Sequence, residues 1–222
     1  MSSLFVTGTD TEVGKTRISV ALIELLQEQG KRVACMKPIA SGCEQTAQGL
    51  RNGDALALMQ QVDVQLDYET INPYAFEPAI APHIAAQKAG VKIDLNHIKQ
   101  LFQQIKSQAD SVIVEGAGGW LVPLNEQQTM ADLAVELGLP VVLVVDIRLG
   151  CINHALLTVA AIKQSGLVLK AWVANQRADN EQATEIINTL QQAISAPCIG
   201  IVPVLEQQQS AVDFLTMDSK ND

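Results

Sequence analysis

The sequence predicts an α/β fold in which a mainly parallel sheet carries helices on both faces. Apolar strand-like runs alternate with helical patterns along the whole chain, and these runs are continuously apolar instead of alternating with polar residues. Continuous apolarity is typical of strands covered on both faces, and regular alternation favours right-handed crossovers between parallel strands. We expect strands at residues 3–7, 32–36, 111–115, 140–146, 169–174 and 198–202.

Helical patterns fill the gaps between these strands. The first follows residue 16 and ends near Gly30, since glycine commonly follows the last helical turn. Asp94 can cap the start of a later helix, and Gly138 and Gly166 are stop signals for two more. We expect these further helices near residues 54–61, 94–108, 130–137, 153–165 and 180–193.

A chain of 222 residues fits one domain, which we expect to span residues 1–222. Residues 38–93 are less regular than the rest and contain four of the eight prolines. A long irregular excursion inside an α/β domain is more often functional than a separate domain. We therefore interpret residues 38–93 as an insertion that covers a substrate, with the proline-punctuated stretch 71–83 as part of the cover.

Composition limits the classes of partner and compartment. With 48% apolar and 18% charged residues the chain is globular, and its net charge of −9 disfavours nucleic acid and membrane surfaces as partners. The sequence shows no leader pattern and no apolar run of membrane-spanning length. The four cysteines form no C-x-x-C pair and no zinc-type spacing, so we expect free thiols and a cytoplasmic protein.

Residues Gly8 to Thr16, GTDTEVGKT, have the pattern of a phosphate-binding loop between a strand and a helix. Five residues instead of four separate Gly8 from Gly14, so the motif is a one-residue-longer variant of the common form. Lys15 would reach the β- and γ-phosphates, and the Thr16 hydroxyl would ligate Mg²⁺. A turn that only caps a helix is the alternative. The loop predicts a P-loop NTPase fold with a nucleotide site.

Two acidic residues stand where a strand ends and where a helix begins. The segment VIVEGAGG (112–119) places Glu115 at the end of an apolar run, and Asp54 opens a helix pattern. Together with Thr16 they supply oxygen ligands suited to Mg²⁺, with waters and phosphate oxygens completing the shell. The alternatives are structural: a turn-capping acid for Glu115 and a helix cap for Asp54.

Three further strand ends point at the same cleft, because ligands bind at the carboxyl ends of strands in such sheets. Lys37 follows the second strand and would point into this cleft. The alternative is an ordinary surface lysine. Gly150 to Asn153 begin a helix whose free N–H groups suit a carboxylate or phosphate. Asn175 follows the fifth strand without the Lys-x-Asp that a guanine site needs. Since an amide can pair with the adenine edge, ATP is favoured over GTP.

Seven segments occur in collinear order over most of the chain: GTDTEVGKT (8–16), KPIASG (37–42), LRNGDALAL (50–58), NPYAFEPAIAPHIAA (72–86), VEGAGGW (114–120), LGCINHALLT (149–158) and WVAN (172–175). Together these segments resemble dethiobiotin synthetase, a family of biotin synthesis. The resemblance implies a homodimer of single-domain P-loop subunits that converts 7,8-diaminononanoate, CO₂ and MgATP into dethiobiotin, ADP and phosphate by closing a cyclic urea.

The resemblance also implies individual roles. Lys37 and Lys15 would be catalytic. The metal ligands would be Thr16, Asp54 and Glu115. The nucleotide would contact Glu12, Val13, Gly14, Lys15, Thr16, Asp54, Glu115, Gly116, Ala117, Gly118, Asn175, Gln176, Pro203, Val204 and Leu205. The substrate would contact Thr11, Ser41, Gly150, Cys151, Ile152 and Asn153, the last four across the dimer interface. Some relatives contribute a tyrosine to that contact, where this chain has Ile186 and Ile187.

Two other functions remain as alternatives. Partitioning-type switch ATPases carry an additional lysine early in the loop, where this chain has Thr9 to Thr11, and many have a basic tail, whereas residues 214–222 are acidic. Cobyrinate-type ligases usually append a glutamine-hydrolysing domain, which we do not expect within 222 residues.

Overall fold

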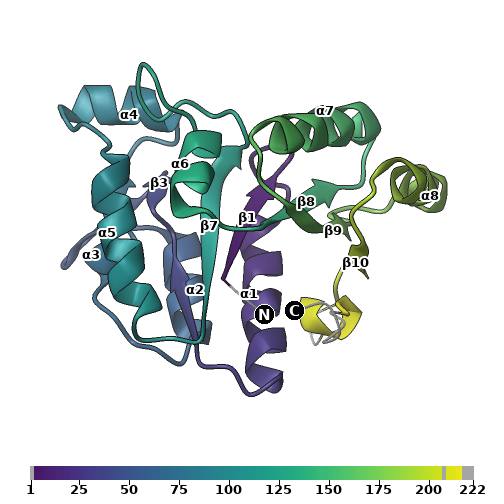
Figure 1. Ribbon diagram of the computed structural model, residues 1–222, viewed down its shortest axis with the longest axis horizontal. Coiled ribbons are helices and arrows are strands. Elements are labelled where there is room, and N and C mark those ends of the chain that lie inside the picture. The colour runs from purple at the N-terminus through teal and green to yellow at the C-terminus, as the bar shows by residue number, and fades with distance from the viewer. Residues whose placement is uncertain (1–2, 207–208, 217–222) are drawn as a thin grey trace.

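The structure is a computed structural model that describes residues 3–206 and 209–216. Its centre is a six-stranded sheet in the order β10-β9-β8-β1-β7-β2, parallel throughout (Figure 1). The strands are β1 (Leu4–Gly8), β2 (Val33–Met36), β7 (Ser111–Gly119), β8 (Val141–Asp146), β9 (Leu169–Asn175) and β10 (Cys198–Val202). The predicted fold class is confirmed, and each expected strand overlaps an observed one.

Helices cover both faces of this sheet. On one face α1 (Lys15–Glu28) packs with α2 (Gly53–Gln61) and the short 3₁₀ helix η1 (Ala211–Phe214). Figure 1 shows α7 on the opposite side of β1 and β8 from α1. That side carries α5 (Leu95–Lys106), α6 (Met130–Leu137), α7 (Cys151–Gln164) and α8 (Ala183–Ala193). Right-handed crossovers require this division, because the chain leaves β1 in one direction across the sheet and returns in the other.

Burial in the core explains why the sequences of the strands are continuously apolar. Every residue of β1 is buried, as are Val141 to Val145 of β8, since helices cover both faces of these central strands. Such burial places the polar residues at strand ends. The carboxyl ends of parallel strands share one edge of the sheet, so Gly8, Lys37 and the end of β7 meet there.

The excursion at 38–93 contains more regular structure than its sequence indicates. Strands β3 (Ile39–Ser41) and β6 (Tyr74–Phe76) pair in parallel, and β4 (Glu44–Thr46) and β5 (Gly49–Arg51) form an antiparallel pair. The helices α3 (Tyr68–Ile71) and α4 (Pro82–Ala89) follow in the same excursion. Sequence analysis did not identify α4, which begins on Pro82, a residue type favoured in the first helical turn.

Both edges of the main sheet are covered by other parts of the chain. At β10, Gly200 forms an antiparallel bridge with Leu215, and the Thr216 N–H donates to the Ile199 carbonyl at 2.7 Å. At β2, the Val33 N–H donates to the Asp63 carboxylate at 3.1 Å. The acidic tail that separates this chain from switch ATPases lies largely outside the described residues, which stop at 216. Among helices in the described ranges, none has the length and apolar character needed to cross a membrane.

Candidate active site

A cleft of about 810 Å³ opens at the carboxyl ends of β1, β2 and β7. The predicted residues that line it are Thr11, Glu12, Gly14, Lys15, Thr16, Lys37, Ser41, Asp54, Glu115, Ala117 and Gly118. Ala79 to Pro82, which belong to the stretch expected to cover a substrate, also line the cleft, and so do residues that the sequence analysis did not single out: Arg17, Ala40, Asn52, Val122 and Arg177. The two arginines adjoin predicted motifs and could have been included on charge alone. The apolar residues give no such signal.

The phosphate loop is held by backbone geometry and by one buried amide. Gly14 precedes α1 with a φ of 91°, a left-handed conformation that favours glycine, and Glu12 has a φ of 59°. The Asn175 Nδ2 donates to the Val13 carbonyl at 2.8 Å, so β9 holds the loop from beneath. A Cβ at position 14 would collide with that amide. The loop therefore depends on a glycine at position 14.

Lys15 begins α1 and is buried, with its ammonium donating to the Asp10 carbonyl at 2.8 Å. Burial and then the nearby charge of Lys37 lower the pKa of Lys15 to about 8. A second anionic partner would compensate for this lost hydration. Lys15 is thus a cation whose environment favours an incoming negative ligand.

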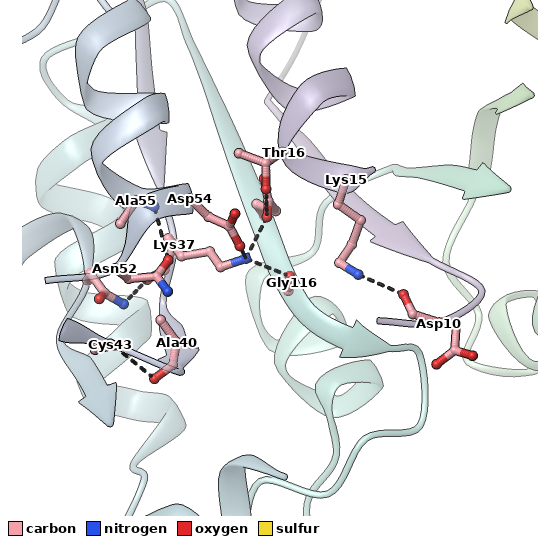
Figure 2. Close-up of polar contacts among 12 residues, drawn as sticks. Asp10, Lys15, Thr16, Lys37, Ala40, Cys43, Asn52, Asp54, Ala55 and Gly116 are labelled. Atoms are coloured by element: carbon pink, nitrogen blue, oxygen red, sulfur yellow. Dashed lines mark hydrogen bonds and ion pairs between the residues drawn. The ribbon is translucent and has the colours of Figure 1, made fainter. Parts of the chain in front are cut away.

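The Lys37 ammonium is surrounded by three acceptors, two from β7 and one from α2 (Figure 2). It lies 2.5 Å from Glu115 Oε1 and 3.1 Å from Asp54 Oδ2, and 3.4 Å from the Gly116 carbonyl. The Thr16 hydroxyl donates to the same Glu115 oxygen at 2.9 Å. Strands β2 and β7 and helices α1 and α2 therefore bring the predicted catalytic lysine and all three predicted metal ligands together.

The charges in this cluster stabilise one another. Burial alone would lower the pKa of Lys37, but the carboxylates of Glu115 and Asp54 raise it above its usual value. Burial likewise opposes ionisation of Asp54, yet the Lys37 ammonium holds the pKa of Asp54 below its ordinary value. Lys37 is therefore charged and Asp54 ionised at neutral pH.

The donor set fits Mg²⁺. Glu115 is fully buried, and its Oε2 has no hydrogen-bond partner among the described residues, because both Lys37 and Thr16 bind Oε1. An orphaned carboxylate oxygen beside a hydroxyl and a second carboxylate is chemistry that a hard cation satisfies. Across residues 3–206 and 209–216, His, Cys, Asp and Glu form no group of three that could enclose a metal. Phosphate and water would complete a shell here.

Several predicted residues do not line the cleft of this chain. They are Val13, Gly116, Asn175, Gln176, Pro203, Val204, Leu205, Gly150, Cys151, Ile152 and Asn153. Asn175 is fully buried and its Nδ2 is occupied by Val13, so only Oδ1, which lacks a partner within the described chain, remains for a base. Such an acceptor suits an exocyclic amino group, as on adenine.

The start of α7 lies apart from the cleft but connects to the phosphate loop. Gly150 adopts a φ of 86° at the helix start, followed by the buried Cys151 and the exposed Asn153. Arg148 lies 3.6 Å from Asp10 in the loop and 3.5 Å from Asp146 at the end of β8. The turn before α7 is therefore tied by an arginine to the loop that would hold phosphate.

Comparison with known proteins agrees with the fold and the motifs. A family model described as an AAA domain matches residues 2–211. The MinD cell division protein of Aquifex aeolicus has a similar structure, with a TM-score of 0.60 at 16% identity, over 96% of this chain and 93% of that one. At this identity the likeness shows the shared fold alone.

Sequence relatives are much closer. A protein named ATP-dependent dethiobiotin synthetase BioD from Pseudomonas aeruginosa (strain UCBPP-PA14) is 52% identical over 98% of this chain and 96% of its own length. One of the same name from Marinobacter nauticus is 49% identical over 94% of this chain and 91% of its own. With nearly full-length identity at this level and the motifs placed around one cleft, the chain belongs to the dethiobiotin synthetase family.

Proposed function

We propose that this chain is an ATP-dependent ligase that closes the cyclic urea of dethiobiotin from 7,8-diaminononanoate and CO₂, releasing ADP and phosphate in biotin synthesis. The observation that carries the proposal is the buried ammonium of Lys37, held by Glu115 and Asp54 beside the phosphate loop. The near full-length relatives that bear the name of this activity support it.

ATP would bind along the phosphate loop, with Glu12 to Thr16 around the triphosphate and the free Oδ1 of Asn175 toward the base. Gly116 to Gly118 and Pro203 to Leu205 remain candidate nucleotide contacts, as does Gln176. Thr16, Asp54 and Glu115 would hold Mg²⁺. The metal would supply Lewis-acid neutralisation of the phosphate oxygens.

The reaction requires the protein to bring two anions together, the carbamate and the γ-phosphate of ATP. A neutral amine of the substrate captures CO₂ to form a carbamate, whose oxygen must approach the γ-phosphorus in line. Lys37 and Lys15 are the buried cations that line the cleft, so they can offset the repulsion and stabilise charge in the transition state. Thr11 and Ser41, which also line the cleft, would orient the diamine.

Ring closure follows from proximity. Phosphoryl transfer yields a carbamic–phosphoric anhydride, and attack by the neighbouring amine forms the second C–N bond and expels phosphate. Because both groups belong to one bound molecule, orientation can supply about 7–11 kcal/mol of the barrier. Water must be excluded to protect the anhydride. The excursion at 38–93 contributes Ala79 to Pro82 to the cleft wall, which supports its proposed role as a cover.

The proposal includes a homodimer in which Gly150 to Asn153 bind the substrate carboxylate of the partner. These residues lie outside the cleft of their own chain, and Leu149 beside them is 94% exposed. Leu157 on α7 is 62% exposed. Exposed leucines before α7 and along it favour a second copy as partner. All four cysteines are free thiols, which agrees with the proposed cytoplasmic location.

The test measures phosphate release from MgATP in the presence of bicarbonate, with and without 7,8-diaminononanoate. The mass of the organic product is determined by mass spectrometry. We expect release to depend on the diamine and the product to be heavier by CO₂ minus water. Hydrolysis of ATP at the same rate without the diamine would contradict the proposal and favour a switch ATPase.

A further inference from the structure

Three polar side chains that the proposed chemistry does not use are buried beside Lys37. Asn52, Tyr68 and Asn72 belong to the excursion at 38–93 and are 6%, 7% and 2% exposed. Buried polar groups are costly unless each finds a partner, and an apolar side chain would fill the same space at lower cost. Their partners therefore indicate what they do.

The side chains of Tyr68 and Asn72 form a continuous hydrogen-bond relay from the backbone N–H of Asn52 to the backbone carbonyl of Lys37. The Asn72 Nδ2 donates to the Lys37 carbonyl at 2.6 Å. The Tyr68 hydroxyl donates to Asn72 Oδ1 at 2.8 Å and accepts from the backbone N–H of Asn52 at 2.7 Å. The Tyr68 hydroxyl thus accepts one hydrogen bond and donates the next. Hydrogen bonds that run in series in this way strengthen one another.

One end of the relay holds the backbone of Lys37, and the other holds the backbone of Asn52, two residues before Asp54. Asn52 is the N-cap of α2, where its Oδ1 accepts from Ala55 at 3.2 Å and fixes the turn that carries Asp54 (Figure 2). At the other end the Lys37 N–H donates to the Ile71 carbonyl at 3.0 Å. The relay therefore joins the backbone of Lys37 to the start of the helix that carries its ion-pair partner Asp54.

The central tyrosine is itself fixed on its outer side. The guanidinium of Arg51 lies 4.0 Å from the centre of the Tyr68 ring and pairs with Glu69 at 3.2 Å. Burial raises the pKa of Tyr68, so its hydroxyl stays protonated and able to donate at neutral pH. The ring has no freedom to leave the relay without breaking these contacts.

We propose that Tyr68, acting through Asn72 and Asn52, is a positioning residue that sets the separation of Lys37 from Asp54. Tyr68 does not line the cleft, and it governs turnover by holding the lysine ammonium and the metal-binding carboxylate at a fixed separation. The inference rests on the proposed function for its catalytic consequence, while its structural consequence is independent of the reaction.

The test compares Tyr68→Phe with Tyr74→Phe. The second variant is a matched control, because Tyr74 lies in the same excursion and its hydroxyl accepts only from the Asp94 N–H in the described chain, away from Lys37. For each we measure kcat, the KM for MgATP, Mn²⁺ affinity of the ADP complex by electron paramagnetic resonance, metal-free ADP affinity and Tm. Tyr68→Phe should lower kcat and Mn²⁺ affinity roughly 10- to 100-fold and leave metal-free ADP affinity within about twofold of wild type. Tyr74→Phe should change neither kcat nor Mn²⁺ affinity.

Two further variants keep the inference testable if Tyr68→Phe is unstable. Asn72→Ala breaks the other end of the relay and should reproduce the loss of Mn²⁺ affinity. In an Asp54→Asn background Tyr68→Phe should have little further effect on Mn²⁺, since both changes act on one ligand. Wild-type kcat and Mn²⁺ affinity in Tyr68→Phe would overturn the inference. The inference would also be overturned if Tyr68→Phe lost metal-free ADP affinity and Mn²⁺ affinity equally, in proportion to a fall in Tm.

Failure of the proposed function gives a different pattern. If the wild-type chain forms no dethiobiotin, the proposed reaction is wrong, and the Mn²⁺ comparison between Tyr68→Phe and Tyr74→Phe still decides the relay. If dethiobiotin forms and the two tyrosine variants behave alike, the relay is wrong and the reaction stands.

Discussion

Lys37 and Glu115 depend on each other because both are buried at the bottom of the cleft. A buried carboxylate without its counter-ion loses its hydration, and no ion pair offsets that cost in free energy. Glu115 also offers one oxygen that neither Lys37 nor Thr16 uses. The same carboxylate can therefore serve a protein cation on one oxygen and a metal on the other.

Lys37→Gln should abolish most turnover and retain nucleotide binding. The amide is one bond shorter than the lysine side chain and removes the charge that offsets repulsion between carbamate and phosphate, so phosphate release should fall by about 10²–10³-fold or more. Calorimetric ADP affinity should stay within about threefold. Lys99→Gln is the control, since Lys99 is half exposed and pairs with Glu136 between α5 and α6. Full activity in Lys37→Gln would remove the lysine from the mechanism.

The pKa of Lys15 predicts how nucleotide affinity changes with pH. Below about pH 8 the ammonium is charged and attracts phosphate, and as pH rises through 8 it becomes neutral. Metal-free ADP should therefore bind more weakly by about tenfold at pH 9 than at pH 7. A Lys15→Arg variant, whose guanidinium stays charged, should show no such change. Equal pH dependence in both proteins would assign the effect to another group.

Much of the cleft could be predicted from single residues. Lys37 follows β2, Asp54 stands at the start of α2 and Glu115 ends the apolar run of β7, so their convergence follows from the parallel sheet. The relay through Tyr68 and Asn72 could not be predicted. Its members are 16 and 35 positions from their partners and fit no period, because loop contacts depend on how the whole excursion folds.

At the scale of elements, the junction of the phosphate loop with α1 is the most restricted part of the chain. Gly14 needs a left-handed backbone, and the Asn175 amide fills the space that a side chain would need. One position thus joins α1, the loop and β9. A change there disturbs the loop as well as the helix start.

Gly14→Ala should lower both stability and nucleotide affinity, whereas Gly138→Ala should lower stability alone. Gly138 ends α6 with a φ of 63° and has open space around it, so alanine there meets only backbone strain of about 1–2 kcal/mol. Gly14→Ala adds a collision with Asn175 and should weaken ADP binding by at least about tenfold. Urea unfolding and calorimetry measure the two effects. Similar ADP affinities in the two variants would contradict the close packing of loop and amide.

Elements were predictable where apolar runs are long. The runs at 140–146 and 198–202 are strands of the main sheet, and the helix expected at 130–137 has those bounds. Strand β7 is longer than expected because its glycines continue the pairing as far as Gly119. The three-residue strands β3 to β6 and helix α4 escaped prediction, since such short segments have no hydrophobic period of their own.

At the scale of the whole molecule, strand order was beyond the sequence. The pairing of β1 with both β7 and β8 joins residues more than a hundred positions apart, and no local pattern specifies it. The proposed dimer likewise depends on surfaces that a single chain leaves exposed. We assign the exposed side chains of Leu149 and Leu157 to its interface.

Changing both Leu149 and Leu157 to Glu should convert the dimer to a monomer. Like charges on the two copies of the patch repel, and the burial of leucine is lost. Analytical ultracentrifugation should show a dimer for the wild-type chain and for Val168→Glu, a control with 63% exposure at the other end of the strands. A wild-type chain that sediments as a monomer at every concentration would contradict the dimer. Loss of activity in the double variant would agree with substrate contacts from the partner.

The covered edge at β10 has a consequence for handling this protein. An open edge strand offers unpaired N–H and C=O groups to any other extended chain and so promotes aggregation. Here the chain after residue 209 covers that edge: Leu215 bridges Gly200, and Ser210 anchors the segment to Glu24 on α1. A truncation before Ser210 would leave the phosphate loop intact in sequence. It would nevertheless expose β10, so precipitation would limit the truncated protein before any loss of chemistry could be measured.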